Sequence, residues 1–402
     1  MADTTDALRF DPTDAAAVMD PYPLYERLRA EDPVHWNPKG FWFLSRYKHV
    51  HALLNDPRLS NSPAPFALVH ARNRDRFAAA EVANNLIAFK DAPEHPKLRG
   101  WVARAFAQHM MQAAPALEQI AGECATGLSP GRRIELVSEL AVPFAARVIC
   151  RVIGLPEEDA RQVAIWSDDF FRLFHAIPDA EEFAKLNQSL SAFRDYMLTQ
   201  VRAREGQPKN DLTSDLLASR SATGSREEIA DNLMLLAADG VGNVQSGLVN
   251  CLYVLLREKE LPAQIHGSAK DRAAVVDECL RLESPGQYQG RIALQPIELE
   301  GKMIRAHSIV LLGLAAANRD PEVFANAGNF DPARRRPQHL AFGSGAHMCM
   351  GNALVRKELS AMLSILLDGK FTLELPPEPM DWLARPGHRW MRRLVVSIGA
   401  VT

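Results

Sequence analysis

The sequence has few cysteines, no long apolar run and no strong excess of charge of either sign. Its 402 residues include five cysteines, and 46 basic residues nearly balance 49 acidic ones to give a net charge of −3. The cysteines are odd in number, scattered and without a CxxC pair, which argues against a disulfide framework or a zinc site. No basic run is interleaved with aromatic residues, so nucleic acid is not an expected partner.

Other absences bear on location and organisation. The sequence contains no stretch of about 18 uncharged apolar residues, the length that would span a membrane. The N-terminus MADTTDALRF lacks the basic-then-apolar order of a signal peptide, so we expect a cytoplasmic protein. No Gly/Ser-rich linker and no repeat divides the chain, and the polar run 204–225 is interpreted as a connection between helices. We therefore predict a single domain over residues 1–402.

The predicted fold class is mainly α with small β-sheets (α+β). Helical signals dominate: DPYPLYERLRAEDP opens with a proline, and VVDECLRLESP stops at one. Strand signals are shorter and are confined to FWFLSRY near the start, IELEGKMIRAHSIVLLG, and FTLEL and LVVSI near the end. These segments predict small, mainly antiparallel sheets beside a large helical body.

One predicted helix has an unusual middle. Ser225 and Glu228 have the spacing of a capping box ahead of a run without proline that reaches residue 260. Apolar residues surround most of this run, which predicts a central, buried helix. Its middle instead gathers glycines and polar residues: Asp239, Gly240, Gly242, Asn243 and Gln245. An internal glycine costs about 1 kcal/mol relative to alanine, so these glycines predict either a nearby ligand or close helix packing.

A lone cysteine lies in the loop FGSGAHMCMG, residues 342–351, directly before the predicted helix NALVRKELSAMLSILL. Gly343 and Gly345 allow a tight turn, and Gly351 allows close approach. The free amides and the dipole at the helix start predict a lowered pKa for the Cys349 thiol. The thiolate could be a nucleophile, with His347 as its base, or an axial metal ligand; the residues leave both open.

Three further groups are spaced for interaction. Glu278 and Arg281, at i and i+3, suit an internal ion pair, although a surface pair has the same spacing. His95 and Arg99, at i and i+4, present two donors to one anionic partner or, alternatively, to solvent. Arg291 is another potential donor.

Together these motifs resemble those of a cytochrome P-450 of the soluble bacterial type. The loop Phe342 to Gly351 fits the FGxGxHxCxG signature at every fixed position, and Glu278 and Arg281 match ExxR. Arg334 in FDPAR is placed like the arginine that completes the family's ion-pair network. The resemblance covers nearly the whole chain and implies the cytochrome P-450 fold, with its long central helix over the distal haem face.

The resemblance also implies a cofactor, heme b (iron protoporphyrin IX). Cys349 would be the axial ligand of the iron, and its thiolate would favour cleavage of an O–O bond. The implied cofactor contacts are His95, Arg99, Arg291, His347, Phe342 and Gly351.

The implied activity is oxidation, most simply hydroxylation, of a small molecule with O2. Electrons would come from a ferredoxin and its reductase, because the chain carries no GxGxxG motif and no cysteine cluster. Arg104, Arg356 and Lys357 could steer an acidic partner, although each could equally be an ordinary solvated charge.

The central helix departs from the family's AGxETT pattern, because the acid position is Gly242 and the alcohol position is Asn243. In the leading hypothesis Asn243 donates a hydrogen bond to dioxygen or holds a water, and Asp239, one turn earlier, supplies protons. Alternatively, a polar group of the substrate completes the relay, or the enzyme uses peroxide or couples substrates oxidatively. A different class of protein, a non-catalytic haem sensor or electron carrier, also stays open. The simplest structural explanation of the Gly-Asn pair is that it is tolerated sequence drift in a helix that approaches the haem closely.

The resemblance places the substrate pocket on several segments. Phe170 and Phe174 share a helical face, for which core packing is the commoner explanation. A largely apolar substrate, such as a terpenoid or polyketide-like specialised metabolite, is expected. The pocket residues predicted are Phe170, Phe174, Leu236, Gly240, Gln245, Gln287, Tyr288 and His388.

Overall fold

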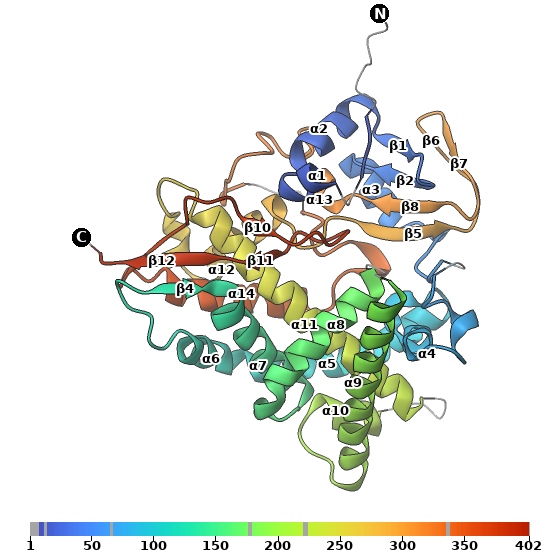
Figure 1. Ribbon diagram of the computed structural model, residues 1–402, viewed down its shortest axis with the longest axis horizontal. Coiled ribbons are helices and arrows are strands. Elements are labelled where there is room, and N and C mark those ends of the chain that lie inside the picture. Colours follow the sequence, from blue (N-terminus) through green and yellow to red (C-terminus); the bar gives the residue numbers. More distant parts are fainter. Residues whose placement is uncertain are drawn as a thin grey trace, which may run out of the picture.

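The structure, a computed structural model, describes residues 8–11, 14–64, 67–175, 179–219, 224–334 and 338–401. It is mainly helical with small sheets, which confirms the predicted fold class. Figure 1 shows the largest sheet beside the N-terminal helices at one end and the helical body at the other.

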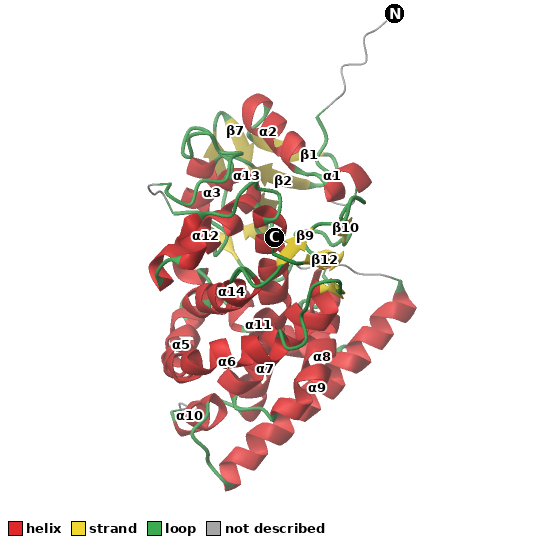
Figure 2. Cartoon of the chain, turned by 90° about the vertical axis from the view of Figure 1, so that its left-hand side faces the viewer, coloured by secondary structure: helices red, strands yellow, loops and turns green. Residues whose placement is uncertain are grey.

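Fourteen α-helices are described in these ranges. They are α1 (Ala15–Met19), α2 (Tyr22–Glu31), α3 (Tyr47–Leu54), α4 (Ala78–Asn85), α5 (Glu94–Ala113), α6 (Leu117–Cys124), α7 (Val142–Ile153), α8 (Ala160–His175), α9 (Ala180–Gly206), α10 (Leu212–Ala218), α11 (Arg226–Leu255), α12 (Ala269–Leu282), α13 (Leu314–Asn318) and α14 (Asn352–Leu366). The helices α5 to α10 gather at one end of the molecule (Figure 2).

Twelve short strands are described. They are β1 (Val34–Asn37), β2 (Phe41–Leu44), β3 (Leu59–Ser60), β4 (Arg133–Glu135), β5 (Gln289–Ala293), β6 (Ile297–Leu299), β7 (Lys302–Ile304), β8 (Ile309–Leu312), β9 (Thr372–Glu374), β10 (Asp381–Trp382), β11 (Met391–Arg393) and β12 (Val395–Gly399). The largest sheet has the order β1-β2-β8-β5-β3, in which only β2 and β8 pair in parallel. Register places Arg291 of β5 opposite Val310 of β8.

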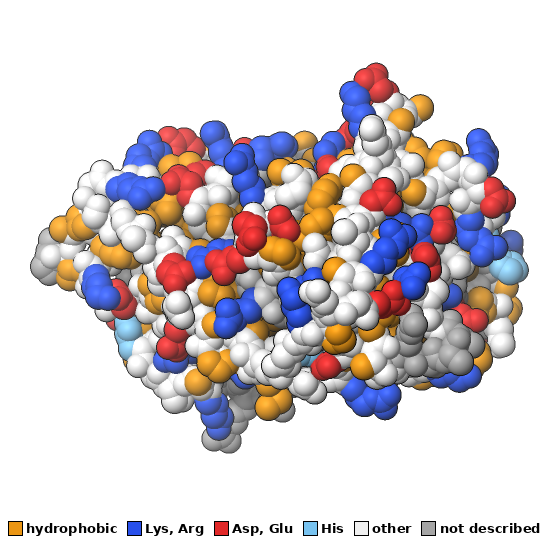
Figure 3. All heavy atoms as spheres, turned by 90° about the horizontal axis from the view of Figure 1, so that it is seen from below, with side chains coloured by type: hydrophobic (Ala, Val, Ile, Leu, Met, Phe, Trp, Pro, Cys, Tyr) orange, Lys and Arg blue, Asp and Glu red, His pale blue; other side chains and the backbone are white. Residues whose placement is uncertain are grey.

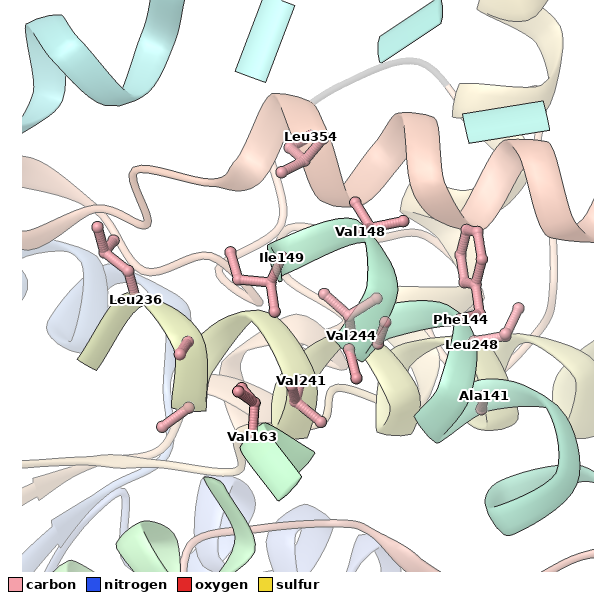
Figure 4. Close-up of a cluster of buried hydrophobic side chains, with 14 of the residues drawn as sticks. Ala141, Phe144, Val148, Ile149, Val163, Leu236, Val241, Val244, Leu248 and Leu354 are labelled. Atoms are coloured by element: carbon pink, nitrogen blue, oxygen red, sulfur yellow. The ribbon is translucent and has the colours of Figure 1, made fainter. Parts of the chain in front are cut away.

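The helix α11 runs through the centre of the molecule, as its apolar circumference predicts. Ser225 caps it by accepting a hydrogen bond from the Glu228 amide at 3.0 Å. Helices α7, α8, α9, α12 and α14 pack around it. Figure 4 shows Ile149 of α7 against α11, at the level where a Cβ on Gly240 would lie 2.6 Å from the Ile149 side chain. Gly240 is therefore a point of close helix packing.

The surface carries mixed charge. On the face seen in Figure 3, basic and acidic side chains alternate without a large area of one sign. Within the ranges that the structure describes, no helix combines the length and the apolar character that a bilayer crossing requires.

Candidate active site

The cysteine loop, residues 342–351, turns tightly and places Cys349 just before the start of α14. Gly343 and Gly345 have φ of +69° and +73°, in the left-handed region that favours glycine. A Cβ on Gly345 would also collide with the side chain of Asn55 at the end of α3. The Cys349 amide donates to the Phe342 carbonyl at 2.9 Å, which closes the loop on itself.

The Cys349 thiol lies deep in the protein. Its pKa is raised to about 11, mainly by burial and also by the carboxylate of Asp239, while a hydrogen bond from the Gly351 amide and the charges of Arg99 and Arg356 act in the opposite direction. The prediction of a lowered pKa is therefore wrong, because burial outweighs the helix terminus. A thiol in this state is a poor nucleophile at neutral pH, whereas a bound metal ion would deprotonate it.

Four donors predicted from the sequence come together on one side of this loop. His95 of α5 stacks on His347, with ring centroids 3.7 Å apart. Arg99 donates to the Met348 carbonyl. Arg291 is buried in β5 and donates to the Gln289 side chain at 2.9 Å.

This cluster of donors, which we call the rim cluster (His95, Arg99, Arg291 and His347), is short of negative charge. Burial, reinforced by His95 and Arg291, lowers the pKa of His347 to about 3, and burial lowers the pKa of Arg291 to about 10. The neighbouring carboxylate of Asp91 already accepts hydrogen bonds from residues 60–62. His95 Nε2 is buried without a hydrogen-bond partner among the described residues. The rim cluster thus fits an anionic group, and so acidic a His347 does not suit the role of base for Cys349.

The opposite wall is the middle of α11. Asp239 and Asn243 lie one turn apart, and the Asn243 amide donates to Asp239 Oδ1 at 3.3 Å. Asp239, Gly240 and Asn243 keep accessible surface although most of α11 is buried, so this part of the helix faces an internal space. Burial at this depth raises the pKa of Asp239 to about 7. The negative charge of Asp239 acts to raise the pKa of Cys349, so the two groups influence each other electrostatically.

Two aromatic residues fill the position beside Gly242. A Cβ there would lie 2.6 Å from Phe171 Cε2 and from Trp390 Cη2. Trp390 is only 1% exposed, and the His388 ring lies 4.8 Å from it and 5.6 Å from the Phe171 ring. All three residues lie on segments that the sequence predicted to line the pocket, although only His388 was singled out. The sequence did not indicate that Phe171 and Trp390 close on Gly242.

Two predicted pocket residues, Gln287 and Tyr288, lie just before β5 and contact the N-terminal segment. Gln287 donates to the Ser284 carbonyl at 2.8 Å and accepts from the Tyr25 hydroxyl at 3.2 Å, so both ends of its amide have protein partners. Tyr288 packs with Phe10 and Phe43 in the N-terminal aromatic cluster. Both residues line a pocket together with His388, and their role in orienting a substrate stays a prediction.

The remaining predicted pocket residues have different surroundings. Phe170 is 4% exposed and packs in the core, which was the commoner explanation of its spacing. Leu236 and Gln245 lie on α11, and the Gln245 carbonyl oxygen is buried without a partner among the described residues. Phe174 lies in the last turn of α8, but its side chain falls outside the described part.

The ExxR pair forms an internal network. Arg281 makes two bonds to Glu278, at 2.7 and 2.8 Å, and Arg334 Nε lies 3.2 Å from the same carboxylate. Arg281 also donates to the carbonyls of Asn318 and Ala327 at 2.8 and 2.7 Å. This network ties α12 to the segment that leads into the cysteine loop.

Of the three predicted surface cations, Arg356 is already engaged. Its Nε lies 2.6 Å from Asp277 Oδ1, and its guanidinium stacks 4.5 Å from the centre of the Phe342 ring. Arg104 and Lys357 are exposed. The charge of Arg356 is therefore paired with Asp277, and its part in steering an acidic partner stays a prediction.

Comparison with known proteins agrees with this geometry. The sequence profile of the family described as Cytochrome P-450 matches residues 273–391. The biotin biosynthesis cytochrome P-450 of Bacillus subtilis (strain 168) is 30% identical, with 94% of this chain and 96% of that protein covered. The monooxygenase PikC of Streptomyces venezuelae is also 30% identical, with 94% and 91% covered.

Solved structures show the same similarity. P450BioI, solved with an acyl carrier protein ligated to hexadec-9Z-enoic acid, has a TM-score of 0.87 at 28% identity, with 95% of this chain and 99% of that chain covered. CalO2 has a TM-score of 0.89 at 28% identity, with 98% and 100% covered.

The fold and the cysteine loop define a haem-thiolate class of protein, and identity of this extent settles the family. The chain belongs to the cytochrome P-450 family and is a bacterial-type monooxygenase.

Proposed function

We propose that this protein holds heme b between Cys349 and the middle of α11 and hydroxylates a largely apolar small molecule with O2. The observation that carries the proposal is the rim cluster beside the loop of the half-buried Cys349, together with an Asp239–Asn243 pair that keeps accessible surface in an otherwise buried helix. Cys349 would ligate the iron, and the rim cluster would hold the propionates. When bound, the haem supplies the oxidising chemistry that no side chain has.

The contribution of α11 is proton control. A side chain at Gly242 would collide with Phe171 and Trp390, so the usual acid position cannot carry an acid in this packing. Asp239 is an accessible carboxyl less than one turn before Gly242, and with a pKa of about 7 it can hold or release a proton near neutrality. Asn243 orients it through their hydrogen bond and presents an amide toward the space.

The substrate and partners follow from the surroundings and from the relatives. Leu236 and Gly240 make the α11 wall apolar on one side of Asp239. Two relatives are named for the molecules on which they act, 20-oxo-5-O-mycaminosyltylactone and mycinamicin IV, which favours a specialised metabolite here too. We expect electrons from a ferredoxin and its reductase, with Arg104 and Lys357 on the approach surface, in the cytoplasm.

The test is the spectrum of the haem-loaded protein. We expect the reduced carbonyl complex to show the Soret band of thiolate ligation. Cys349→His should keep haem but lose that band, because imidazole replaces the thiolate. Cys124→Ser, at a half-buried cysteine of α6, is the matched control and should retain it. A thiolate band that survives in Cys349→His would overturn the proposal.

The blocked acid position also supports a second candidate, a peroxide-using enzyme that needs no relay for dioxygen. In that case hydrogen peroxide alone should give product at rates equal to those with ferredoxin and reductase. Product formation that requires the electron donors would favour the monooxygenase.

A further inference from the structure

A closed chain of contacts surrounds the cysteine loop and is anchored on Asp277. This residue precedes Glu278 in α12, but its carboxylate joins a different set of partners. Oδ1 accepts from His339 Nε2 at 3.1 Å and from Arg356 Nε at 2.6 Å. Although burial acts to raise the pKa of Asp277, these two partners hold it below its usual value. The carboxylate is therefore a fixed negative charge beside the loop.

One arm of this chain runs through His339. Its Nδ1 accepts from the Ala341 amide at 3.2 Å, so the ring proton must be on Nε2, where it is donated to Asp277. The His339 ring also lies 5.6 Å from the Phe342 ring. The Phe342 carbonyl then accepts from the Cys349 amide at 2.9 Å. This arm fixes the amide side of Cys349.

The other arm runs through Arg356. Its guanidinium covers the Phe342 ring, and Nη1 donates to Asn352 Oδ1 at 2.9 Å. The Asn352 side-chain amide donates to the Cys349 carbonyl at 2.7 Å. The two arms thus reach both peptide groups of Cys349 from a single carboxylate.

We infer that Asp277, His339 and Arg356 are positioning residues that fix the Cys349 loop and set the electrostatic environment of its sulfur. This inference rests on the proposed function, in which Cys349 ligates the haem iron. Side chains that support a metal ligand commonly tune both its orientation and its electron donation. Here they do so with opposite charges on two different helices, α12 and α14.

The opposite charges give a signature that a merely structural role would lack. The positive charge of Arg356 stabilises negative charge on the sulfur and weakens its donation to iron. It would therefore favour the reduced iron more than a neutral residue at this position would. Removing its charge should strengthen donation by the thiolate and lower the reduction potential. Removing the charge of Asp277 leaves Arg356 unbalanced and should raise the potential.

The experiment is a reductive titration of the haem-loaded protein. We expect Arg356→Gln and Asp277→Asn to shift the midpoint potential in opposite directions. Arg356→Lys, which keeps the charge, should stay near the wild type. Lys357→Gln removes the exposed neighbouring charge on α14 and is the matched control, with a smaller shift than Arg356→Gln. Shifts of the same sign, or an equal shift in the control, would overturn the inference.

A second measurement covers variants that fold poorly. His339→Asn keeps an acceptor near the Nδ1 position, whereas His339→Gln keeps a donor near the Nε2 position. We expect each to lose only one of the two hydrogen bonds of the His339 ring and to retain more of the thiolate-type carbonyl band than His339→Ala, which loses both bonds. Equal retention in all three would count against the role of His339.

The failure of this inference is separable from that of the proposed function. If Cys349 does not ligate iron, the wild type itself lacks the thiolate band. If the wild type shows the band and the potentials do not follow the two charges, only the positioning role fails.

Discussion

At the scale of single residues, Asp239 combines properties that rarely occur together. It is deep enough for burial to raise its pKa to about 7, yet its side chain keeps accessible surface. Its Oδ1 accepts a hydrogen bond from the side-chain amide of Asn243, one turn later on the same helix. Proton transfer is most efficient when the donor's pKa lies near the working pH, and Asp239 meets that condition.

We predict that Asp239→Asn uncouples electron consumption from product formation by about tenfold or more, the scale of a lost general acid. The wild-type carboxyl is protonated below its pKa of about 7 and loses its proton above it. Coupling should therefore fall as the pH rises through about 7, and the variant should be low at every pH. The measurement is product formed per NADPH consumed.

Asp195→Asn, at an exposed position of α9, is the control and should couple like the wild type. Coupling by Asp239→Asn that matches the wild type across the pH range would assign the proton source to the substrate or solvent instead.

At the scale of elements, α11 is held where α8 and the segment before β11 meet it. Phe171 and Trp390 come from these two elements and close on Gly242. Their ring centroids are 4.8 Å apart at an interplanar angle of 75°, an edge-to-face arrangement. The glycine is what allows this approach.

We predict that Gly242→Ala destabilises the protein by about 1–3 kcal/mol, the usual cost of overpacking a core. The new methyl group would lie 2.6 Å from both rings, and Trp390 has no space into which to move because it is fully packed. Gly247→Ala in the same helix is the matched control. Its Cβ would meet its nearest neighbours at 3.4 and 3.5 Å, so the gain in helix propensity, up to about 1 kcal/mol, should dominate. Chemical denaturation would measure the free energy of unfolding of both variants. Equal stability of Gly242→Ala and Gly247→Ala would contradict the packing argument.

The contrast between the two glycines also shows what the sequence can predict. The helices α2, α11, α12 and α14 follow from local signals such as proline, a capping serine and apolar periodicity. Short apolar runs predict the strands β2, β6 to β9 and β12, but not the remaining ones. The cysteine loop follows from glycines at fixed spacing. A glycine inside a helix indicates that another group approaches closely, but the local sequence does not identify that group.

What the sequence could not predict depends on contacts between distant segments. Phe171 and Trp390 are 219 positions apart, as their numbers show, yet their ring centroids lie 4.8 Å apart beside Gly242. The Gln287 amide is satisfied by Tyr25, from the other end of the chain. The pKa of Cys349 was predicted in the wrong direction because the helix start is a local property and burial is a global one.

At the scale of the whole molecule, one buried carboxyl opposes folding at neutral pH. Glu358 of α14 is 1% exposed, and one of its oxygens has no hydrogen-bond partner among the described residues. Burial raises its pKa from 4.5 to about 8. A raised carboxyl pKa means that the folded state holds a proton that the unfolded state releases. Unfolding is therefore favoured as the pH rises between these two values.

We predict that Glu358→Gln removes this dependence, because the amide is neutral in both states. Below pH 4.5 the variant and the wild type should unfold with similar free energies, and between pH 4.5 and about 8 the variant should become progressively more stable. The difference should grow by about 1.4 kcal/mol per pH unit, to an upper limit of about 5 kcal/mol. Denaturant titrations across this range measure it, with Glu118→Gln at an exposed position of α6 as the control. A variant that is less stable than the wild type near pH 8 would mean that the Glu358 carboxylate is stabilised in the folded protein and that burial does not set its charge.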